Sequence, residues 1–67
     1  MNLVEGLTEE ILRVTEIVRE YKELPNGAGI FAAILMEESL RIAKEAQASG
    51  DIVAMMAALM DLKEFEM

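Results

Sequence analysis

Cysteine, histidine and tryptophan are absent from this 67-residue sequence, and proline occurs once. Without cysteine the chain cannot form a disulfide, and without cysteine and histidine it lacks the usual ligands of a structural zinc ion. The same absences remove the commonest general base and the thiol nucleophile of enzymes. They also exclude most transition-metal sites, and the missing cysteine fits a reducing compartment.

Positive charge is also scarce. Six lysines and arginines stand against thirteen aspartates and glutamates, which gives a net charge of −7. Proteins that bind nucleic acid concentrate basic residues on one face, so we expect no nucleic-acid partner, and the same charge disfavours an anionic lipid surface. The N-terminus lacks the basic segment, apolar stretch and cleavage site of a targeting signal. We expect a cytoplasmic protein without a membrane partner.

Carboxylates are abundant, so we compared them with the metal sites of all-α pyrophosphohydrolases. Those enzymes carry an E-E-x-x-E cluster on one helix and a further acidic pair on a later helix. Here Glu37 and Glu38 are followed by Arg41 at the third position, and Asp61 with Glu64 leaves the set incomplete. We therefore predict a protein that is not an enzyme, with no catalytic residue, no metal and no cofactor.

Two runs of nine residues, 28–36 and 52–60, contain no polar side chain. Each run is about half as long as a membrane span requires. A helix that is apolar on every side must be surrounded by protein, and a chain this short has little of its own to supply. Ordering it costs roughly 1.5 kcal/mol per residue, which burial must offset. We therefore expect copies of the chain to enclose both runs in a symmetric homo-oligomeric helical bundle.

The spacing of the apolar residues predicts an all-α fold. In the first helix they recur every three or four positions, from Val4 through Ile11 to Val18, as expected for a helix that packs on one side. We predict one domain over residues 1–67 with three helices, at about residues 8–24, 28–48 and 51–65.

The start of the first helix has two candidate N-caps, Asn2 (together with Glu5) and Thr8. Because Gly6 weakens the turn before Thr8, we expect residues 1–7 to be frayed and the firm helix to begin at Thr8.

The other boundaries are marked more clearly. Pro25 ends the first helix because the residue before a proline is pushed out of the helical region. Gly50 is the expected C-cap of the second helix and Asp51 the expected N-cap of the third. A connection this short predicts that the second and third helices form an antiparallel hairpin.

The turn between the first two helices, Asn26 to Gly29, contains two glycines. Free N–H groups at a helix start, approached closely through glycine, can bind a phosphate, and in a symmetric oligomer several such turns could converge on one ligand. An ordinary turn between helices explains the same residues. The candidate ligand-binding residues, which include the nearby basic and aromatic side chains, are Arg19, Tyr21, Lys22, Asn26, Gly27 and Gly29.

Four methionines lie in the two apolar runs. Methionine adapts to foreign partners and also fills ordinary helical cores, and we assign these four to the core or to a self-interface. The residues predicted for the core or the oligomer interface are Ile11, Val14, Val18, Ile30, Phe31, Ile34, Leu35, Met36, Ile52, Met55, Met56, Leu59 and Met60.

A Pro/Gly turn leads into G-A-G-I-F-A-A-I-L-M, and A-Q-A-S-G-D-I-V-A-M joins the second helix to the third. On these motifs the stretch 25–66, about two thirds of the chain, resembles small, uncharacterised all-helical proteins of tailed phages and prophages. The resemblance implies a compact accessory protein in the cytoplasm of the host cell. Accessory proteins of this kind often bind and disable a host component.

We therefore predict a non-enzymatic phage-type accessory protein, a small acidic homo-oligomer that binds and inhibits or sequesters a host component of defence or regulation. One alternative is a sponge for a phosphorylated small molecule, such as a cyclic nucleotide signal, held at subunit junctions near the Asn26–Gly29 turn. A second alternative is a structural or assembly subunit without a ligand.

Overall fold

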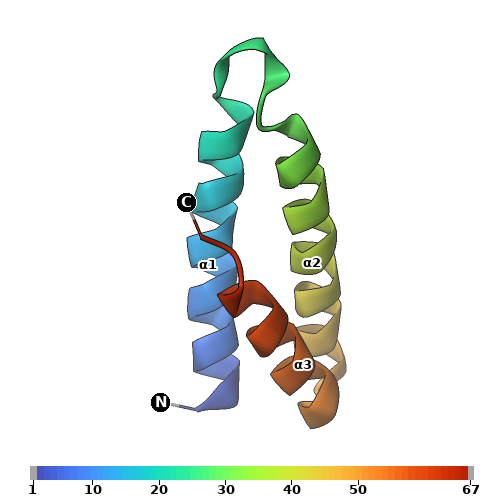
Figure 1. Ribbon diagram of the computed structural model, residues 1–67. Helices are drawn as coiled ribbons and strands as arrows, with labels where there is room; N and C mark the ends of the chain where they lie inside the picture. Colours follow the sequence, from blue (N-terminus) through green and yellow to red (C-terminus); the bar gives the residue numbers. More distant parts are fainter. Residues whose placement is uncertain (1, 67) are drawn as a thin grey trace.

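The computed structural model describes residues 2–66, and within them all regular structure is helical. The chain forms three α-helices and one short 3₁₀ helix: α1 (Leu3–Lys22), η1 (Pro25–Gly27), α2 (Ile30–Ser49) and α3 (Ile52–Lys63). Helices α1 and α2 lie side by side and are joined at one end through η1, and α3 turns back from the far end of α2 (Figure 1). Every pair of the three α-helices is in contact. The predicted all-α fold with three helices is confirmed.

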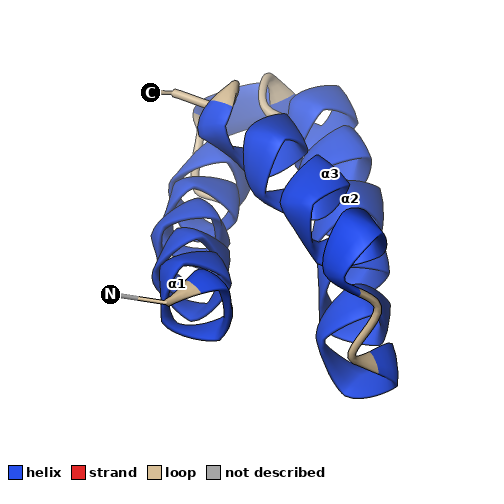
Figure 2. Ribbon diagram, turned by 90° about the horizontal axis from the view of Figure 1, so that it is seen from below, coloured by secondary structure: helices blue, strands red, loops and turns tan. Residues whose placement is uncertain are grey.

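The view along the helices shows how α3 is placed (Figure 2). It begins beside the end of α2 and ends close to α1, so that it covers one side of the α1–α2 pair. The molecule is elongated, with principal extents of 39 × 19 × 16 Å.

Helix α1 begins earlier than the sequence suggested. The Asn2 side-chain oxygen accepts a hydrogen bond from the Glu5 backbone N–H at 2.8 Å, and the Asn2 amide donates to the Glu5 carboxylate at 3.1 Å. The Asn2 cap satisfies the free backbone N–H of Glu5 in the first turn, and Gly6 is accommodated inside the helix. The start at Thr8 was therefore wrong, and of the segment expected to be frayed, residues 3–7 are helical while Met1 lies outside the described residues.

As predicted, the first connection forms around Pro25, but it is longer than expected. Leu24, before Pro25, has the extended backbone (φ −64°, ψ 142°) that proline imposes on its predecessor. Asn26 and Gly27 then adopt left-handed conformations, with φ of 60° and 69°. Helix α1 consequently ends two residues before the predicted boundary, and α2 begins two residues after it, at Ile30.

The second connection consists of Gly50 and Asp51 alone. Gly50 is left-handed (φ 72°) and its N–H donates to the Ala46 carbonyl at 3.1 Å, which closes α2. The Asp51 carboxylate accepts the Ala54 N–H at 3.2 Å and caps α3. Both predicted cap residues are confirmed, and α3 ends at Lys63, two residues before the predicted end.

The core of the described chain is entirely apolar. Leu7, Val14 and Leu62 are its largest fully buried side chains. Four of the thirteen core residues are alanines, which let the helices approach closely but enclose little volume. The full set is Leu7, Ile11, Val14, Ile17, Val18, Ala33, Met36, Leu40, Ala43, Ala46, Met55, Ala58 and Leu62.

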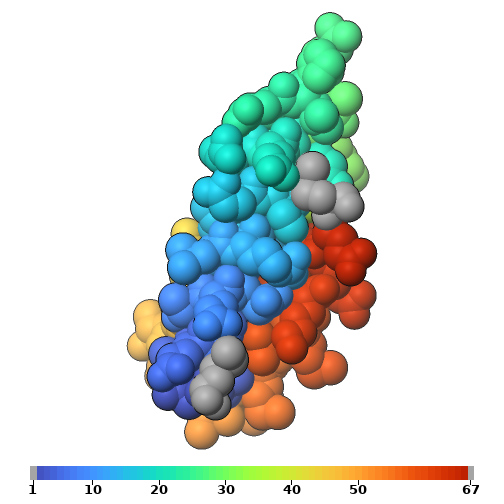
Figure 3. All heavy atoms as spheres, turned by 90° about the vertical axis from the view of Figure 1, so that its left-hand side faces the viewer, coloured from blue at the N-terminus to red at the C-terminus, as the bar shows by residue number. Residues whose placement is uncertain are grey.

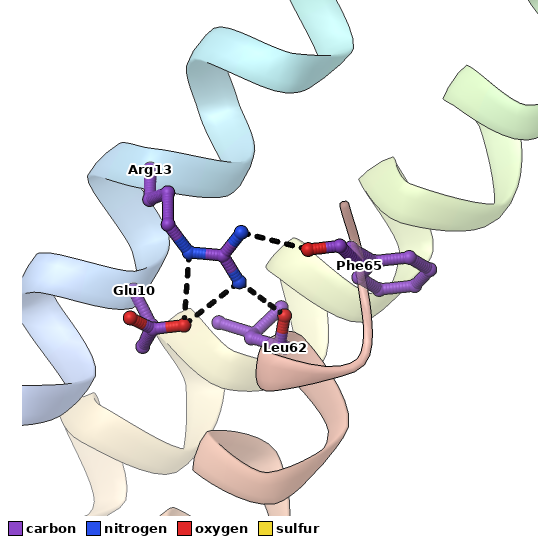
Figure 4. Close-up of polar contacts among 4 residues, drawn as sticks. All are labelled: Glu10, Arg13, Leu62 and Phe65. Atoms are coloured by element: carbon purple, nitrogen blue, oxygen red, sulfur yellow. Dashed lines mark hydrogen bonds and ion pairs between the residues drawn. The ribbon is translucent and has the colours of Figure 1, made fainter. Parts of the chain in front are cut away.

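One arginine ties the end of α3 to α1 (Figure 4). The Arg13 guanidinium donates to the Leu62 carbonyl at 2.8 Å and to the Phe65 carbonyl at 2.7 Å. Glu10 accepts from the same guanidinium at 2.8 and 3.1 Å and so orients it. The last carbonyls of a helix have no partner within the helix, and a cation there also complements the helix dipole. Arg13 therefore satisfies the C-terminal end of α3 from a neighbouring helix.

The segment after α3 lies along α1. Figure 3, which views the molecule from the side of α1, shows the red C-terminal part of the chain beside α1. The Tyr21 hydroxyl donates to the Glu66 carbonyl at 3.4 Å, and Phe65 packs against the core.

We predict that Arg13→Gln destabilises the fold by about 1 kcal/mol, because two carbonyls at the end of α3 lose a charged donor. Urea unfolding at fixed protein concentration measures the loss, and amide hydrogen exchange should show faster exchange at residues 62–66. Lys63→Gln, which removes the same charge but no such hydrogen bond, is the control. An Arg13→Gln protein with unchanged exchange in this segment would contradict the assigned role.

Candidate functional site

The most prominent surface feature is apolar. Helix α2 exposes Ile30, Phe31, Ile34, Leu35 and Ile42, and Phe31 is 75% exposed. These positions recur at spacings of three, four and seven residues, so they lie on one broad side of the helix, away from the core. We call these five residues the α2 apolar face.

Helix α3 carries a second surface of this kind. Ile52, Val53, Met56 and Met60 are exposed, Val53 to 76% and Met60 to 68%. Their spacing again places them on one side of the helix. We call these four residues the α3 apolar face.

The two faces are large for so small a protein. Their nine large apolar residues are each 43–76% exposed. The total accessible surface, 4510 Å², exceeds the ~4,200 Å² expected for a compact monomer of this mass. The radius of gyration, 12.2 Å, exceeds the ~11 Å expected for a compact domain of this length. The chain by itself does not enclose its two apolar runs.

The residues predicted for the core or interface divide into two groups. Buried within the chain are Ile11, Val14, Val18, Met36 and Met55, with Leu59 partly buried against them. The other seven, all in the apolar runs, lie on the two apolar faces: Ile30, Phe31, Ile34, Leu35, Ile52, Met56 and Met60.

A second feature is a groove between α1 and α2 with a volume of about 490 Å³. Two of its residues, Val18 and Leu40, belong to the core and form an apolar floor. Four of the chain's six basic residues line it, against a single carboxylate. We call it the basic groove, and its lining is Thr15, Val18, Arg19, Lys22, Glu37, Leu40, Arg41 and Lys44.

Carboxylates hold both arginines of the basic groove. Arg19 pairs with Glu16 at 2.8 Å and with Glu23 at 2.7 Å. Hydrogen bonding and charge from Glu16, with the charge of Glu23, raise the pKa of Arg19 above its usual value.

Arg41 on α2 repeats this arrangement. It pairs with Glu38 and, at 2.8 Å, with Glu45. A hydrogen bond from Arg41 and its positive charge lower the pKa of the Glu38 carboxyl, and the same contacts raise the pKa of Arg41. Both guanidiniums are therefore fixed as cations at any pH of interest.

The two lysines of the groove differ from each other. Lys22 bridges the helices through an ion pair with Glu37 at 2.8 Å. Lys44 makes no ion pair within residues 2–66. The groove therefore has one basic side chain whose charge no carboxylate of the described chain meets directly.

The structure places the residues of the predicted turn site in three different parts of the molecule. Arg19 and Lys22 line the basic groove, which includes neither Asn26 nor Gly27 nor Gly29. Tyr21 reaches instead toward the C-terminal segment through its bond to Glu66.

Gly29 has a packing role. A Cβ at this position would overlap the Tyr21 carbonyl oxygen and lie 2.9 Å from the Tyr21 Cβ. Its backbone (φ −100°) is open to any residue, so space rather than conformation requires glycine.

Sequence reasoning missed Arg41 and Lys44 as members of this groove. A signal was present: E-x-x-R-x-x-x-E occurs at 16–23 and again at 38–45. In a helix this spacing places a carboxylate one turn to either side of the arginine. The recurrence on two helices marks matched charged positions, but only their packing brings the two arginines to one groove.

The described residues contain neither a cluster of metal ligands nor a buried polar side chain. Within residues 2–66 no group of three or more acidic side chains is arranged to hold a metal ion. In the same range no charged or polar side chain is buried.

Comparison with protein-family models, with curated proteins and with solved structures returns no match. Among the helices of residues 2–66, none combines the length and the apolar character needed to cross a bilayer.

We predict that Gly29→Ala lowers the free energy of unfolding by about 1–3 kcal/mol, because the new methyl group overlaps the end of α1. Thermal or urea unfolding measures the change. Gly50→Ala is the comparison, because nothing lies within 4 Å of a Cβ there. We expect it to lower the free energy of unfolding by only about 1 kcal/mol, the cost of a left-handed backbone at alanine. Full stability of Gly29→Ala would show that the turn does not pack on Tyr21.

We predict that Arg41→Gln moves the titration of the Glu38 carboxyl back up toward its ordinary value of 4.5, since the pairing that lowers the pKa is lost. A carboxyl with a lowered folded-state pKa stabilises the fold above its unfolded value, and this contribution disappears as the pH falls through the lowered pKa. Carbon-detected NMR of the Glu38 carboxyl between about pH 2 and 7 reads it directly. Lys63→Gln should leave the Glu38 titration unchanged.

Proposed function

We propose that this chain is a non-catalytic interaction protein that works as a homo-oligomer, with copies joined through the α2 and α3 apolar faces. Side chains of this size are rarely left exposed together on a monomer, and such surfaces are typical of protein–protein contacts. The observation that carries the proposal is the exposure of both faces, and Phe31 and Val53 are the most exposed large apolar side chains.

The area supports a second copy as the occupant. The two faces together carry nine exposed large apolar residues, and the core left to a lone chain has four alanines among thirteen residues. A small domain with so little interior gains stability by association. In this proposal α2 and α3 act as an antiparallel hairpin that presents both faces to its symmetry mate, and a closed symmetric assembly buries the same patch on each copy.

The proposed role of the assembly is to bind and inhibit, or to sequester, a host component, without chemistry of its own. The resemblance of residues 25–66 to small phage proteins motivates this role. The exposed methionines Met56 and Met60 support it, because their flexible side chains adapt to more than one partner. The absence of histidine and cysteine supports a role without catalysis.

A second candidate function is the sequestration of a phosphorylated small molecule. The basic groove favours it, since four basic side chains gather there in a chain of net charge −7. In this form of the proposal the ligand lies between α1 and α2 rather than at the Asn26–Gly29 turn.

We predict that Phe31→Glu and Val53→Glu each shift the protein toward monomer while the helices remain folded. A charge at either position would have to be desolvated in the interface, which costs several kcal/mol. Sedimentation velocity or light scattering across a range of concentrations measures the mass, and circular dichroism checks the helices.

Leu12→Glu is the matched control, because Leu12 is a large apolar residue that is 63% exposed on α1, outside both apolar faces. It adds the same charge and should leave the mass unchanged. A wild-type protein that is monomeric at about 100 µM would refute self-association, since interfaces of standard size give dissociation constants well below that.

A further inference from the structure

We propose that the basic groove binds a small molecule carrying two or more phosphate charges, which bridges α1 and α2. This assigns a site and a ligand class to the second candidate function, and it is independent of self-association through the apolar faces.

The distribution of charge is the first argument. In the whole chain carboxylates outnumber basic residues by thirteen to six, whereas the groove lining contains four basic residues and one carboxylate. Arg19 and Lys22 come from α1, and Arg41 and Lys44 come from α2. A ligand between the helices therefore meets basic side chains from both walls.

The shape is the second argument. A volume of about 490 Å³ lies in the range of small-molecule sites, ~300–1,000 Å³. The floor is formed by Val18 and Leu40, each only 6% exposed, so the groove has a firm apolar base between charged walls. This combination suits a phosphorylated molecule with a less polar portion, such as a nucleotide.

Carboxylates around the groove compete with a ligand for its basic side chains. Five of them pair with three of its basic residues, and Lys22 shares its charge with Glu37 inside the lining. All these groups are at least 46% exposed, and ion pairs that are so exposed are screened by water and add little to stability. A phosphate is a stronger competitor, because guanidiniums bind it through paired, charge-assisted hydrogen bonds.

The pairing also explains why the cations are held in position. Each arginine is gripped by glutamates one turn before and one turn after it, so the guanidinium is kept along its own helix wall. Lys44, which has no ion-pair partner within residues 2–66, is the side chain with the least competition for a ligand phosphate. Its removal should therefore weaken binding without breaking an ion pair.

The test uses the full chain, with inorganic tripolyphosphate and ATP as probes, titrated by isothermal calorimetry and by ¹⁵N NMR at about 50 mM salt. Binding should shift amide signals at residues 15–22 and 37–44, and ~0.3 M salt should weaken it because the site is exposed. Binding of tripolyphosphate by itself would support the proposal. Tighter binding of ATP than of tripolyphosphate would also support a contact with the apolar floor.

Lys44→Gln should weaken the affinity by about tenfold, the loss of one charge-assisted hydrogen bond. Lys63→Gln removes the same charge from α3, away from the groove, and should change the affinity by less than about twofold. NMR spectra of both variants confirm that they fold.

Two results would overturn the site. One is an absence of amide-signal shifts in the groove residues with either probe at about 5 mM. That concentration would saturate any site whose dissociation constant is about a hundred times lower. The other is an equal effect of Lys44→Gln and Lys63→Gln, which would mean general charge attraction. Neither result bears on the mass measured by sedimentation, so failure of this site and failure of self-association are told apart.

Discussion

The interior that a chain of 67 residues can enclose limits everything else in this structure. Three helices bring thirteen side chains out of water, and alanine supplies four of them, so the helices approach closely while the apolar volume stays small. No disulfide is available to supplement this core. Large apolar residues of α2 and α3 consequently remain at the surface of the chain.

Polar interactions in this protein fix geometry at the edges of the core. Arg13 is the clearest example, because its guanidinium on α1 donates to the Leu62 carbonyl in the last turn of α3 and to the Phe65 carbonyl just beyond it. Asn2 and Asp51 do the same at helix starts. The molecule is thereby left with two surfaces of opposite character: the apolar faces on α2 and α3, and the charged groove between α1 and α2. One suits association, and the other suits an anion.

The sequence and the structure agree best where a residue acts on its immediate neighbours. Pro25 ends a helix by sterics, and Gly50 and Asp51 cap helices through bonds that span at most four residues. The start of α1 was misjudged because the penalty of Gly6 was weighed above the paired hydrogen bonds of Asn2 and Glu5. The sequence grouped Arg19 and Lys22 with the Asn26–Gly29 turn, whereas in the structure they line the groove between α1 and α2.

By itself the sequence determined the helices, the approximate place of each break and the surplus of apolar side chains, because periodicity and capping are local properties. Only the tertiary structure decided which apolar residues the chain covers, since a run that is apolar on all sides gives no indication of its inward face. It also decided that Arg41 and Lys44 stand opposite Arg19 and Lys22. Residues some twenty positions apart meet there through the packing of α1 on α2, which no local pattern encodes.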